Sequence, residues 1–374
     1  MNSVLYKRYH LHKTKPENTE QIKNYNRKRP YGPQEYFCFA PFKSLYFGAN
    51  GQVISCCYNR KYILGTYPSD TIKEIWTGSK LGKLRTAIEN SDLSLGCNAC
   101  KDQFDDENYD AILSINYDKI PYNKNFPTLM EFELSNTCNL GCIMCDERFS
   151  TYIAANKGIP LKKMQYDQAF TDQLDEFIPH LSEAKFLGGE PFLIPIYMDI
   201  WGKIISMNPD CRIIIQTNGT VLTDKAKQLM KNGNFHFNIS IDSFRKENYE
   251  SIRVNASFEK TMENFKYIYD YCKKRNNYFG VGVCPIRQNW MELPEILRYV
   301  NELDITVYFN RVWTPAECAL WGWDSEHLLN IFNRLKEETF EASTDVQQKN
   351  VQHYNEFIRQ IYAWYLESKN SEEK

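Results

Sequence analysis

Between residues 128 and 315 the chain alternates short apolar runs with longer amphipathic segments, and this alternation constrains the fold most strongly. The apolar runs are rich in β-branched and aromatic residues, which favours strands, whereas the segments between them have helical apolar spacing. The predicted strands are 128–135, 184–189, 211–218, 235–242, 278–286 and 305–312. The predicted helices are 167–181, 193–206, 223–232, 257–275 and 291–302.

Strands that alternate with helices predict a parallel sheet with right-handed crossovers. Six such units exceed half of an eight-unit barrel without completing it, so we expect an α/β fold with a partial (β/α)6 TIM-like barrel over 128–315. Residues 316–374 have a helical pattern and are predicted to form an extension that covers one end or side. In parallel barrels the chemistry lies in the loops after the strands. Most of the unusual motifs of this chain fall in such loops.

Three further segments precede the barrel. Residues 36–104 read as short strands and turns followed by a helix, and they are predicted to form a small α+β domain. Residues 105–127 are polar, carry two prolines and are predicted to be a linker. Residues 1–35 are polar and locally basic, so we expect a solvated arm, with a peptide or partner contact as the alternative.

Composition excludes several classes of protein. The net charge of −2 argues against a general nucleic-acid binder, which carries a strong basic excess. No run approaches the roughly 18 apolar residues of a membrane span, and no secretory signal pattern opens the chain. We therefore expect a cytoplasmic protein without a membrane partner. Thiols stay reduced in that compartment, so the 12 cysteines suggest metal ligands before disulfides.

Cysteine spacing after the first predicted strand predicts a metal centre. The stretch TCNLGCIMC contains Cys138, Cys142 and Cys145. Thiolates are soft donors that bind zinc or iron–sulfur clusters. A zinc site completed by Cys211 or a histidine is one explanation, but the CxxxCxxC spacing differs from that of the usual zinc motifs. The other explanation is a 4Fe–4S cubane held by three cysteines, which leaves one iron with an open coordination position.

In this motif the chain resembles the radical S-adenosylmethionine (SAM) superfamily, in which the amino and carboxylate groups of SAM chelate the fourth iron. The resemblance implies that Cys138, Cys142 and Cys145 hold the catalytic cluster. The family usually has an aromatic residue just before the third cysteine, close to the adenine. Met144 stands there in this chain, and a polarisable thioether can also cover an adenine face.

Four later motifs resemble SAM-binding segments of the same family. GGEP, after the second strand, is implied to hold the SAM amino group, and TNGT, after the third, to reach the ribose. SID, closing the fourth strand, and a downstream arginine are implied to hold the SAM carboxylate, although Asp242 could instead cap the next helix. RQNW, after the fifth strand, offers a further polar contact. The implied cofactor-binding residues are Gly188, Gly189, Glu190, Asn218, Ser240, Arg253 and Asn289, with Gln288 as the alternative to Asn289.

The cysteines of segment 36–104 carry a second resemblance. A cysteine, a hairpin glycine and a second cysteine, followed by CNAC, resemble the SPASM/twitch appendage of one radical SAM subgroup. Here the appendage precedes the barrel, whereas in most of the subgroup it follows. A zinc ribbon is the other explanation for these cysteines. The resemblance implies one auxiliary 4Fe–4S cluster on Cys38, Cys56, Cys97 and Cys100, with Cys57 as the alternative to Cys56.

Two further groups of side chains have less specific predicted roles. Glu131 and Glu133 share one face of the first predicted strand, where they would contact substrate or form a structural ion pair. The four remaining cysteines are predicted to be core thiols. The last two of these lie near the predicted cavity rim, where either could donate a hydrogen atom to a substrate radical; the four are Cys211, Cys272, Cys284 and Cys318.

The resemblance implies that a reduced cluster cleaves SAM to methionine and a 5′-deoxyadenosyl radical, which abstracts hydrogen from a C–H bond of the substrate. The auxiliary cluster would accept an electron from the substrate radical, conduct electrons or act structurally. A flavodoxin or ferredoxin is the implied electron donor. Many enzymes of the subgroup crosslink, epimerise or cleave ribosomally made peptides, so a peptide is the predicted substrate and a separate recognition protein a predicted partner. The alternatives are oxidation of a small molecule such as a sugar or aminocyclitol, and a zinc-stapled binding protein without enzymatic activity.

Overall fold

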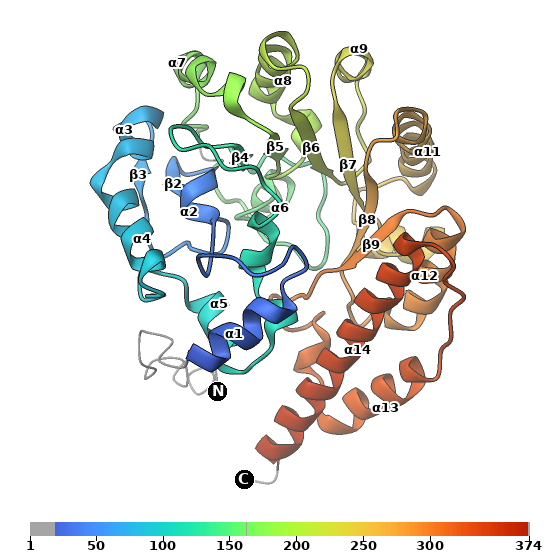
Figure 1. The fold of residues 1–374 in the computed structure, drawn as a ribbon. Helices are drawn as coiled ribbons and strands as arrows, with labels where there is room; N and C mark the ends of the chain where they lie inside the picture. Colours follow the sequence, from blue (N-terminus) through green and yellow to red (C-terminus); the bar gives the residue numbers. More distant parts are fainter. Residues whose placement is uncertain (1–18, 162, 373–374) are drawn as a thin grey trace. The chain divides into compact units, whose positions relative to one another are not determined.

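The computed structural model describes residues 19–161 and 163–372 (Figure 1). Packing divides the chain into two compact units. The first of these units, unit 1, contains the first predicted strand of the barrel as well as the segments that precede it in the chain. The predicted domain boundaries follow sequence motifs rather than packing, and they stay a prediction. Unit 1 comprises Met1–Leu134, Met164–Lys185 and Ser206–Cys211, and unit 2 comprises Ser135–Lys163, Phe186–Ile205 and Arg212–Lys374.

Unit 1 contains a mixed sheet in the strand order β3-β2-β1-β4. An antiparallel hairpin of β1 and β2 pairs with β3 through β2 and runs parallel to β4 through β1. All four residues of β1 are buried, which favours pairing along both of its edges. The strands are β1 (Ser44–Phe47), β2 (Gln52–Ile54), β3 (Gly65–Thr66) and β4 (Leu129–Phe132), and β5 (Glu183–Phe186) follows β4 in the strand order.

Local sequence signals explain the turns and helix starts of unit 1. The β1–β2 hairpin turns at Gly51, which has a φ of +82° and whose missing Cβ would lie 2.3 Å from the Tyr67 carbonyl oxygen. Helix α3 begins with a capping box, in which Thr71 and Glu74 satisfy each other's backbone N–H groups. The α-helices of this unit are α1 (Thr19–Lys28), α2 (Ala40–Lys43), α3 (Ile72–Thr77), α4 (Ser79–Glu89), α5 (Asn98–Asp105) and α7 (Gln168–Gln173).

Two predictions about unit 1 are wrong. The stretch after residue 18 is not a solvated arm, because α1 buries Tyr25, whose hydroxyl lies 2.6 Å from Ser114 Oγ, and buried Arg29 Nε donates to Asp118 at 2.8 Å. The segment that supplies both partners was predicted to be a linker, yet it packs into the core. Its polarity is misleading because the buried polar groups satisfy one another. The first 18 residues of the predicted arm lie outside the described residues.

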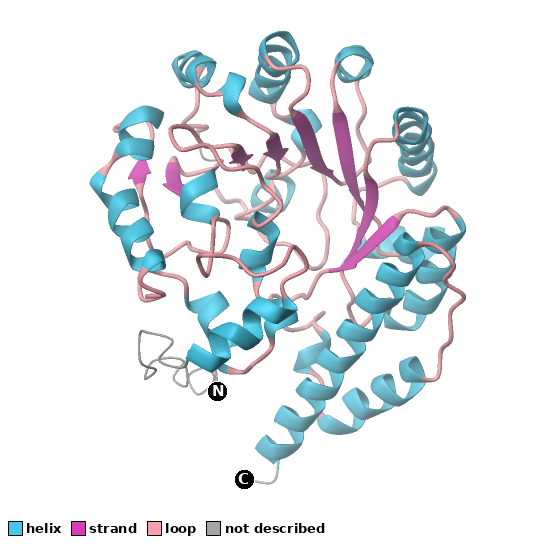
Figure 2. Ribbon diagram, in the orientation of Figure 1, coloured by secondary structure: helices cyan, strands magenta, loops and turns pink. Residues whose placement is uncertain are grey.

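Unit 2 contains four parallel strands that pair in chain order, with helices along one face (Figure 2). Alternate strand residues pack under these helices: Phe235 contacts Trp201 of α8, and Phe279 contacts Phe265 of α11. The strands are β6 (Arg212–Thr217), β7 (Phe235–Ser240), β8 (Phe279–Val283) and β9 (Thr306–Phe309). The remaining α-helices of the described chain are α6 (Thr151–Asn156), α8 (Pro195–Met207), α9 (Asp224–Asn232), α10 (Lys246–Ile252), α11 (Phe258–Arg275), α12 (Leu293–Glu302), α13 (Ser325–Lys336) and α14 (Asp345–Glu372).

The outer edge of β9 is covered by side chains of α14. Asn350 Oδ1 accepts the Val307 N–H at 2.9 Å, and Asn350 Nδ2 donates to the Ile305 carbonyl at 2.8 Å. His353 Nδ1 lies 2.8 Å from the Val307 carbonyl oxygen. These contacts occupy backbone groups that an edge strand would otherwise expose. The predicted helical extension thus covers one side of the strands of unit 2.

The α/β fold class, with barrel-like strand–helix units and a helical extension, is confirmed. The predicted helix 167–181 is broken: α7 ends at Gln173, and two short 3₁₀ turns follow it, of which the second contains Pro179. Helices α6 and α10 lie in loops after strands and were not predicted. None of the helices in the described part of the chain combines the length and hydropathy needed to cross a bilayer.

Candidate functional site

The loop that carries Cys138, Cys142 and Cys145 is held by the GGEP turn. Gly189 N–H donates to the first carbonyl of this loop, that of Ser135, at 3.1 Å. A Cβ on Gly189 would lie 2.2 Å from the Thr137 carbonyl oxygen, and a Cβ on Gly188 would lie 2.5 Å from the Ser135 carbonyl oxygen. Both positions therefore require glycine for the two backbones to approach this closely.

Glu190 lies deeper than its predicted role as a SAM contact requires. It is fully buried, and both carboxylate oxygens accept hydrogen bonds from the protein. Oε1 accepts from Thr217 Oγ1 at 2.7 Å and from the Phe192 N–H at 3.2 Å, and Oε2 accepts from the Asn218 N–H at 2.7 Å. Burial raises the pKa of this carboxyl to about 7. The carboxylate thus ties the GGEP turn to the end of β6, which makes it a positioning group.

The TNGT segment after β6 contacts the cysteine loop directly. Asn218 Nδ2 donates to Asn139 Oδ1 at 3.1 Å and lies 3.9 Å from Cys138 Sγ. Asn139 Nδ2 in turn donates to Thr220 Oγ1 at 2.9 Å. The structure therefore brings Asn218 beside the first cysteine, as a SAM-binding role would require, and that role stays a prediction.

A third segment holds the other side of the loop. The N–H groups of Gly141 and Ile143 donate at 2.9 and 3.0 Å to the backbone carbonyls on either side of Arg253. This pairing places Arg253 Nη1 3.8 Å from Cys142 Sγ. Arg253 Nη2 lies 2.7 Å from Asp242 Oδ2, and both side chains are almost completely buried. Burial lowers the pKa of the guanidinium, but the charge of Asp242 outweighs it and raises that pKa, so Arg253 keeps its charge although it is buried.

We expect Asp242→Asn to destabilise the protein by about 3 kcal/mol, because it leaves the buried Arg253 charge without its partner. Urea unfolding of both proteins at neutral pH measures the difference. Glu295→Gln, in the exposed ion pair with Arg245, is the matched control and should leave the urea midpoint unchanged. A wild-type midpoint in Asp242→Asn would show that the pair does not contribute to stability.

The three thiols and Arg253 fit a 4Fe–4S cluster with a SAM carboxylate beside it. Burial raises the pKa of Cys138, Cys142 and Cys145, so their thiolates need compensating positive charge such as that of cluster iron. Arg253 Nε is buried without a hydrogen-bond partner among the described residues, so its N–H group can donate a hydrogen bond to a further ligand.

Asn289, like Glu190, directs its polar groups into the protein rather than toward a SAM ligand. It is fully buried, its Nδ2 donates to the Asp242 and Cys284 carbonyls at 2.8 and 3.1 Å, and its Oδ1 accepts the Ile286 N–H at 2.8 Å. The amide is therefore fully used in shaping the turn after β8. Its alternative, Gln288, is exposed. A polar residue after a strand looks the same in sequence whether it points at a ligand or back into its own turn.

Two other predicted contacts are placed without a decisive partner. Ser240 Oγ lies 3.1 Å from Gln216 Nε2 rather than beside Arg253. Met144 is partly buried against an apolar cluster that includes Ile252 and Cys318. Their roles toward SAM stay predictions.

Sequence reasoning missed the groups that anchor the loop. Asp242 was considered as a helix cap, but α10 begins only at Lys246, and the carboxylate pairs with Arg253 instead. Thr217, Asn139 and Thr220 were passed over although they lie inside the motifs TNGT and TCNLGCIMC. Their polar side chains are the signal that would have identified them.

The cysteines outside the two motifs are mostly core thiols, as predicted. Cys211 and Cys272 are 1% exposed and Cys318 is 4% exposed. Cys284 is partly buried beside the same apolar cluster as Cys318, and its backbone N–H donates to Asp242. Hydrogen donation by Cys284 or Cys318 stays a prediction.

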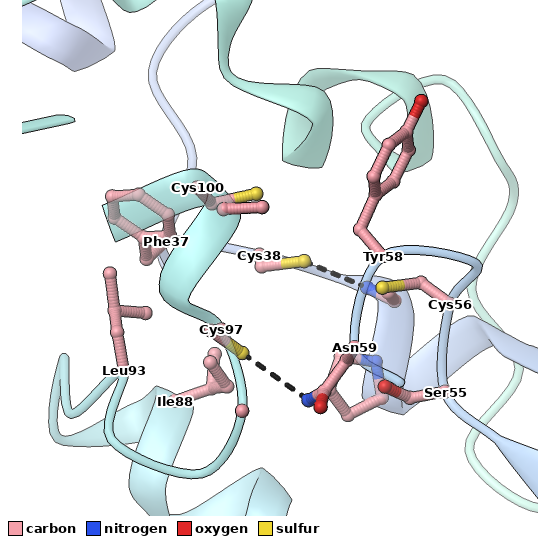
Figure 3. Close-up of a pocket in the computed structure, with 14 residues that line it drawn as sticks. Phe37, Cys38, Ser55, Cys56, Tyr58, Asn59, Ile88, Leu93, Cys97 and Cys100 are labelled. Atoms are coloured by element: carbon pink, nitrogen blue, oxygen red, sulfur yellow. Dashed lines mark hydrogen bonds between the residues drawn. The ribbon is translucent and has the colours of Figure 1, made fainter. Parts of the chain in front are cut away.

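In unit 1 the other four predicted ligands line one pocket of about 400 Å³, open solvent included. Figure 3 shows Cys38, Cys56, Cys97 and Cys100 around it. Cys97 and Cys100 lie one turn apart at the start of α5, so both thiols face the same side. Burial raises the pKa of all four thiols, as at the first site, and these residues therefore fit a second iron–sulfur cluster.

The pocket distinguishes the two neighbouring cysteines of the β2 turn. Cys56 lines it and Cys57 does not. Asn59, two residues further on, is buried and donates to the Leu95 carbonyl at 2.8 Å and to Cys97 Sγ at 3.5 Å (Figure 3). This side chain joins the turn of Cys56 to the turn before α5, and so aligns ligands from two distant segments.

Glu131 of β4 and Glu133, which directly follows that strand, form ion pairs, as one of their two predicted roles requires. Lys185 Nζ lies 3.7 Å from Glu131 Oε2, and Arg60 Nη2 lies 3.0 Å from Glu133 Oε2. Glu133 also accepts a hydrogen bond from Tyr46 Oη. Burial raises the pKa of Glu133 to about 7.

We expect stability to fall as pH rises from about 4.5 to 7, because the folded protein binds the Glu133 proton more tightly than the unfolded chain does. The loss is at most about 3.4 kcal/mol, because the folded and unfolded pKa values differ by roughly 2.5 and each unit of pKa corresponds to 1.36 kcal/mol. Glu133→Gln removes this titration and should make the profile shallower, while Glu190, whose pKa burial also raises to about 7, still contributes to the slope. Urea unfolding of both proteins between pH 5 and 8 tests it, and parallel profiles would contradict it.

Two families match the regions that hold these sites. The radical SAM superfamily matches residues 132–300, and the iron–sulfur cluster-binding SPASM domain matches residues 38–101. The chain belongs to the radical SAM superfamily. Its cofactors are SAM with a 4Fe–4S cluster and, through the SPASM-type domain, an auxiliary iron–sulfur cluster. The hypothesis of a zinc-stapled binding protein is therefore wrong.

The curated relatives are distant. The chain is 24% identical over 217 residues to GTP 3′,8-cyclase of Limosilactobacillus fermentum, covering 56% of this chain and 61% of the relative. It is 22% identical over 248 residues to AdoMet-dependent heme synthase of Methanosarcina barkeri, covering 63% of this chain and 65% of the relative. The chain thus spans less than two thirds of the length of these relatives.

Two of the solved structures that match part of the chain contain bound SAM. The anSMEcpe protein with bound AdoMet matches with a TM-score of 0.42 and 18% identity, covering 56% of this chain and 58% of that chain. SuiB of Streptococcus suis bound to S-adenosylmethionine matches with a TM-score of 0.42 and 13% identity, covering 69% of this chain and 57% of that chain.

Proposed function

We propose that this radical SAM enzyme modifies a ribosomally made peptide by hydrogen abstraction, leading to a crosslink, an epimerised residue or a cleaved backbone. The observation that carries the catalytic part is the convergence of GGEP, TNGT and Arg253 on the three-cysteine loop. Each of these segments follows a different strand, and all belong to unit 2.

When bound, the cluster and SAM supply the 5′-deoxyadenosyl radical that takes a hydrogen atom from the substrate. The protein's own residues bind and orient. Cys138, Cys142 and Cys145 would hold the cluster, and Arg253 would hold the SAM carboxylate. Glu190 fixes the backbone of Asn218 through its carboxylate, and it thereby orients the amide that lies beside Cys138.

The peptide substrate is supported by three uncharged polar side chains that unit 2 carries at neighbouring strand ends. Gln216, Ser240 and Asn310 contribute amides and a hydroxyl near the carboxyl ends of β6, β7 and β9. Such groups match the backbone of a peptide. The hydroxyls of a sugar or aminocyclitol would satisfy the same groups, which keeps oxidation of a small molecule as the second candidate.

Further components of the proposal concern partners. A flavodoxin or ferredoxin would supply the electron for SAM cleavage. A separate peptide-recognition protein would deliver the substrate, because the described part of the predicted basic arm is packed into unit 1 and does not offer a free binding segment. We place this reaction in the cytoplasm.

The test is anaerobic incubation of the reconstituted enzyme with SAM, a reductant and a short peptide encoded beside its gene. We expect 5′-deoxyadenosine formation to rise with the peptide and the peptide mass to change, as read by liquid chromatography and mass spectrometry. An unmodified peptide, together with a sugar or aminocyclitol that is converted to its ketone, would replace the peptide with the small-molecule candidate.

A further inference from the structure

Two carboxamides of unit 2 converge on one glycine. Gly282 lies on β8, and a Cβ built on it would lie 3.2 Å from Asn310 Nδ2 and 3.7 Å from Gln216 Nε2. Beyond the chain neighbours of the glycine, no other heavy atom of the described residues lies within 4 Å of that point. Gln216 comes from β6 and reaches across β7, whereas Asn310 directly follows β9, the strand that pairs with β8 on its other side. An atom above Gly282 would therefore contact both.

The free hydrogen-bonding capacity of these amides suits an oxygen acceptor. One N–H of Gln216 is used toward Ser240 Oγ at 3.1 Å, which leaves the second. The side chain of Asn310 is exposed, and no side-chain hydrogen bond joins it to the described residues. A carbonyl oxygen has two lone pairs and accepts two N–H donors at about 2.9 Å each.

The charges nearby favour a neutral ligand. Arg212 begins β6, four residues before Gln216, which is about 13 Å along a strand. Asp242 and Arg253, after β7, neutralise each other as an ion pair. Neither Arg212, at that distance, nor the paired Asp242 and Arg253 supplies a counter-charge to a carboxylate or phosphate above Gly282, whereas an amide carbonyl needs only the two donors.

We propose that Gln216 and Asn310 form a two-donor site above Gly282 for a backbone carbonyl oxygen of the peptide substrate. This inference rests on the proposed peptide-modifying function and deepens it by naming residues that select the substrate. The absence of a side chain at Gly282 leaves room for the carbonyl oxygen to approach the two amides from this side of the strand. A methyl group at residue 282 would project into that space and hold the oxygen away from them.

The test uses N-acetylglycinamide as the probe, with the reconstituted enzyme and SAM, and saturation-transfer difference NMR as the measurement. We expect the wild type to bind it, Gly282→Ala to weaken binding at least about tenfold, and Gln216→Leu or Asn310→Leu about tenfold each, as for loss of one hydrogen bond. Gly202→Ala is the matched control, since a Cβ on Gly202 meets nothing within 4 Å. Sodium acetate should bind more weakly than the amide.

The inference is overturned if the wild type does not bind the amide, if Gly282→Ala binds it as well as Gly202→Ala does, or if acetate or erythritol binds with the same dependence on the variants. Asn310 is exposed, so Asn310→Leu decides the matter should Gly282→Ala fail to fold. Binding of the probe without modification of any peptide would overturn the proposed function alone. A modified peptide with wild-type probe affinity in Gly282→Ala would overturn the inference alone.

Discussion

Cys142→Ala is expected to abolish SAM cleavage, lowering 5′-deoxyadenosine formation about 1,000-fold or more, because the cofactors carry the chemistry and the protein only holds them in place. The structure gives a reason to choose this cysteine. Its sulfur lies 3.8 Å from Arg253 Nη1, at the centre of a loop anchored on three sides. The measurement is 5′-deoxyadenosine by liquid chromatography after anaerobic reaction with SAM and dithionite.

The matched control is Cys272→Ala, because Cys272 is a buried thiol of α11 outside both cysteine motifs. We expect it to retain SAM cleavage. Iron analysis separates loss of a ligand from general damage: Cys142→Ala should lose about four irons per chain and keep the auxiliary cluster. Normal SAM cleavage in Cys142→Ala would show that the three-cysteine loop does not hold the catalytic cluster.

The strands of the barrel could be predicted closely because each is a short apolar run bounded by turn residues. Strands β6 to β9 fall inside the predicted segments, and the motifs follow them. Burial of polar segments could not be predicted in this way. Arg29 and Asp118 are 89 residues apart, and only the folded chain shows that they neutralise each other in the core. Considered alone, each segment is charged and is therefore predicted to be exposed to solvent.

The residues of the candidate site also differ in how well the sequence predicts them. Residue types with one dominant use, such as three spaced cysteines and two adjacent glycines, could be placed from sequence. Residues with several uses could not. Glu190 and Asn289 carry polar groups beside the right loops, yet both direct them into the protein. Asp242 was missed as the partner of Arg253 for the converse reason, since an aspartate before a helix usually suggests a cap.

The auxiliary ligands provide the second large effect. Cys97→Ala is expected to lose about four irons per chain while SAM is still cleaved without substrate, and to yield no modified product. All four predicted auxiliary ligands belong to unit 1, whereas the three-cysteine loop belongs to unit 2, so the variant removes no anchor of that loop. Iron content, 5′-deoxyadenosine and product mass are measured on the same preparation. Normal product yield from Cys97→Ala would mean that the auxiliary cluster has no part in turnover.

The adjacent pair Cys56 and Cys57 makes this test specific. The two residues share a turn, and each is partly buried, but only Cys56 lines the pocket with Cys97 and Cys100. We therefore expect Cys56→Ala to lose the same iron as Cys97→Ala, and Cys57→Ala to keep the wild-type content. The reverse result would make Cys57 the ligand, and it would require the turn after β2 to rearrange when the cluster binds. Wild-type iron content in both variants would instead mean that either thiolate can serve as the fourth ligand of the auxiliary cluster, because a one-residue shift along the turn is enough to exchange them.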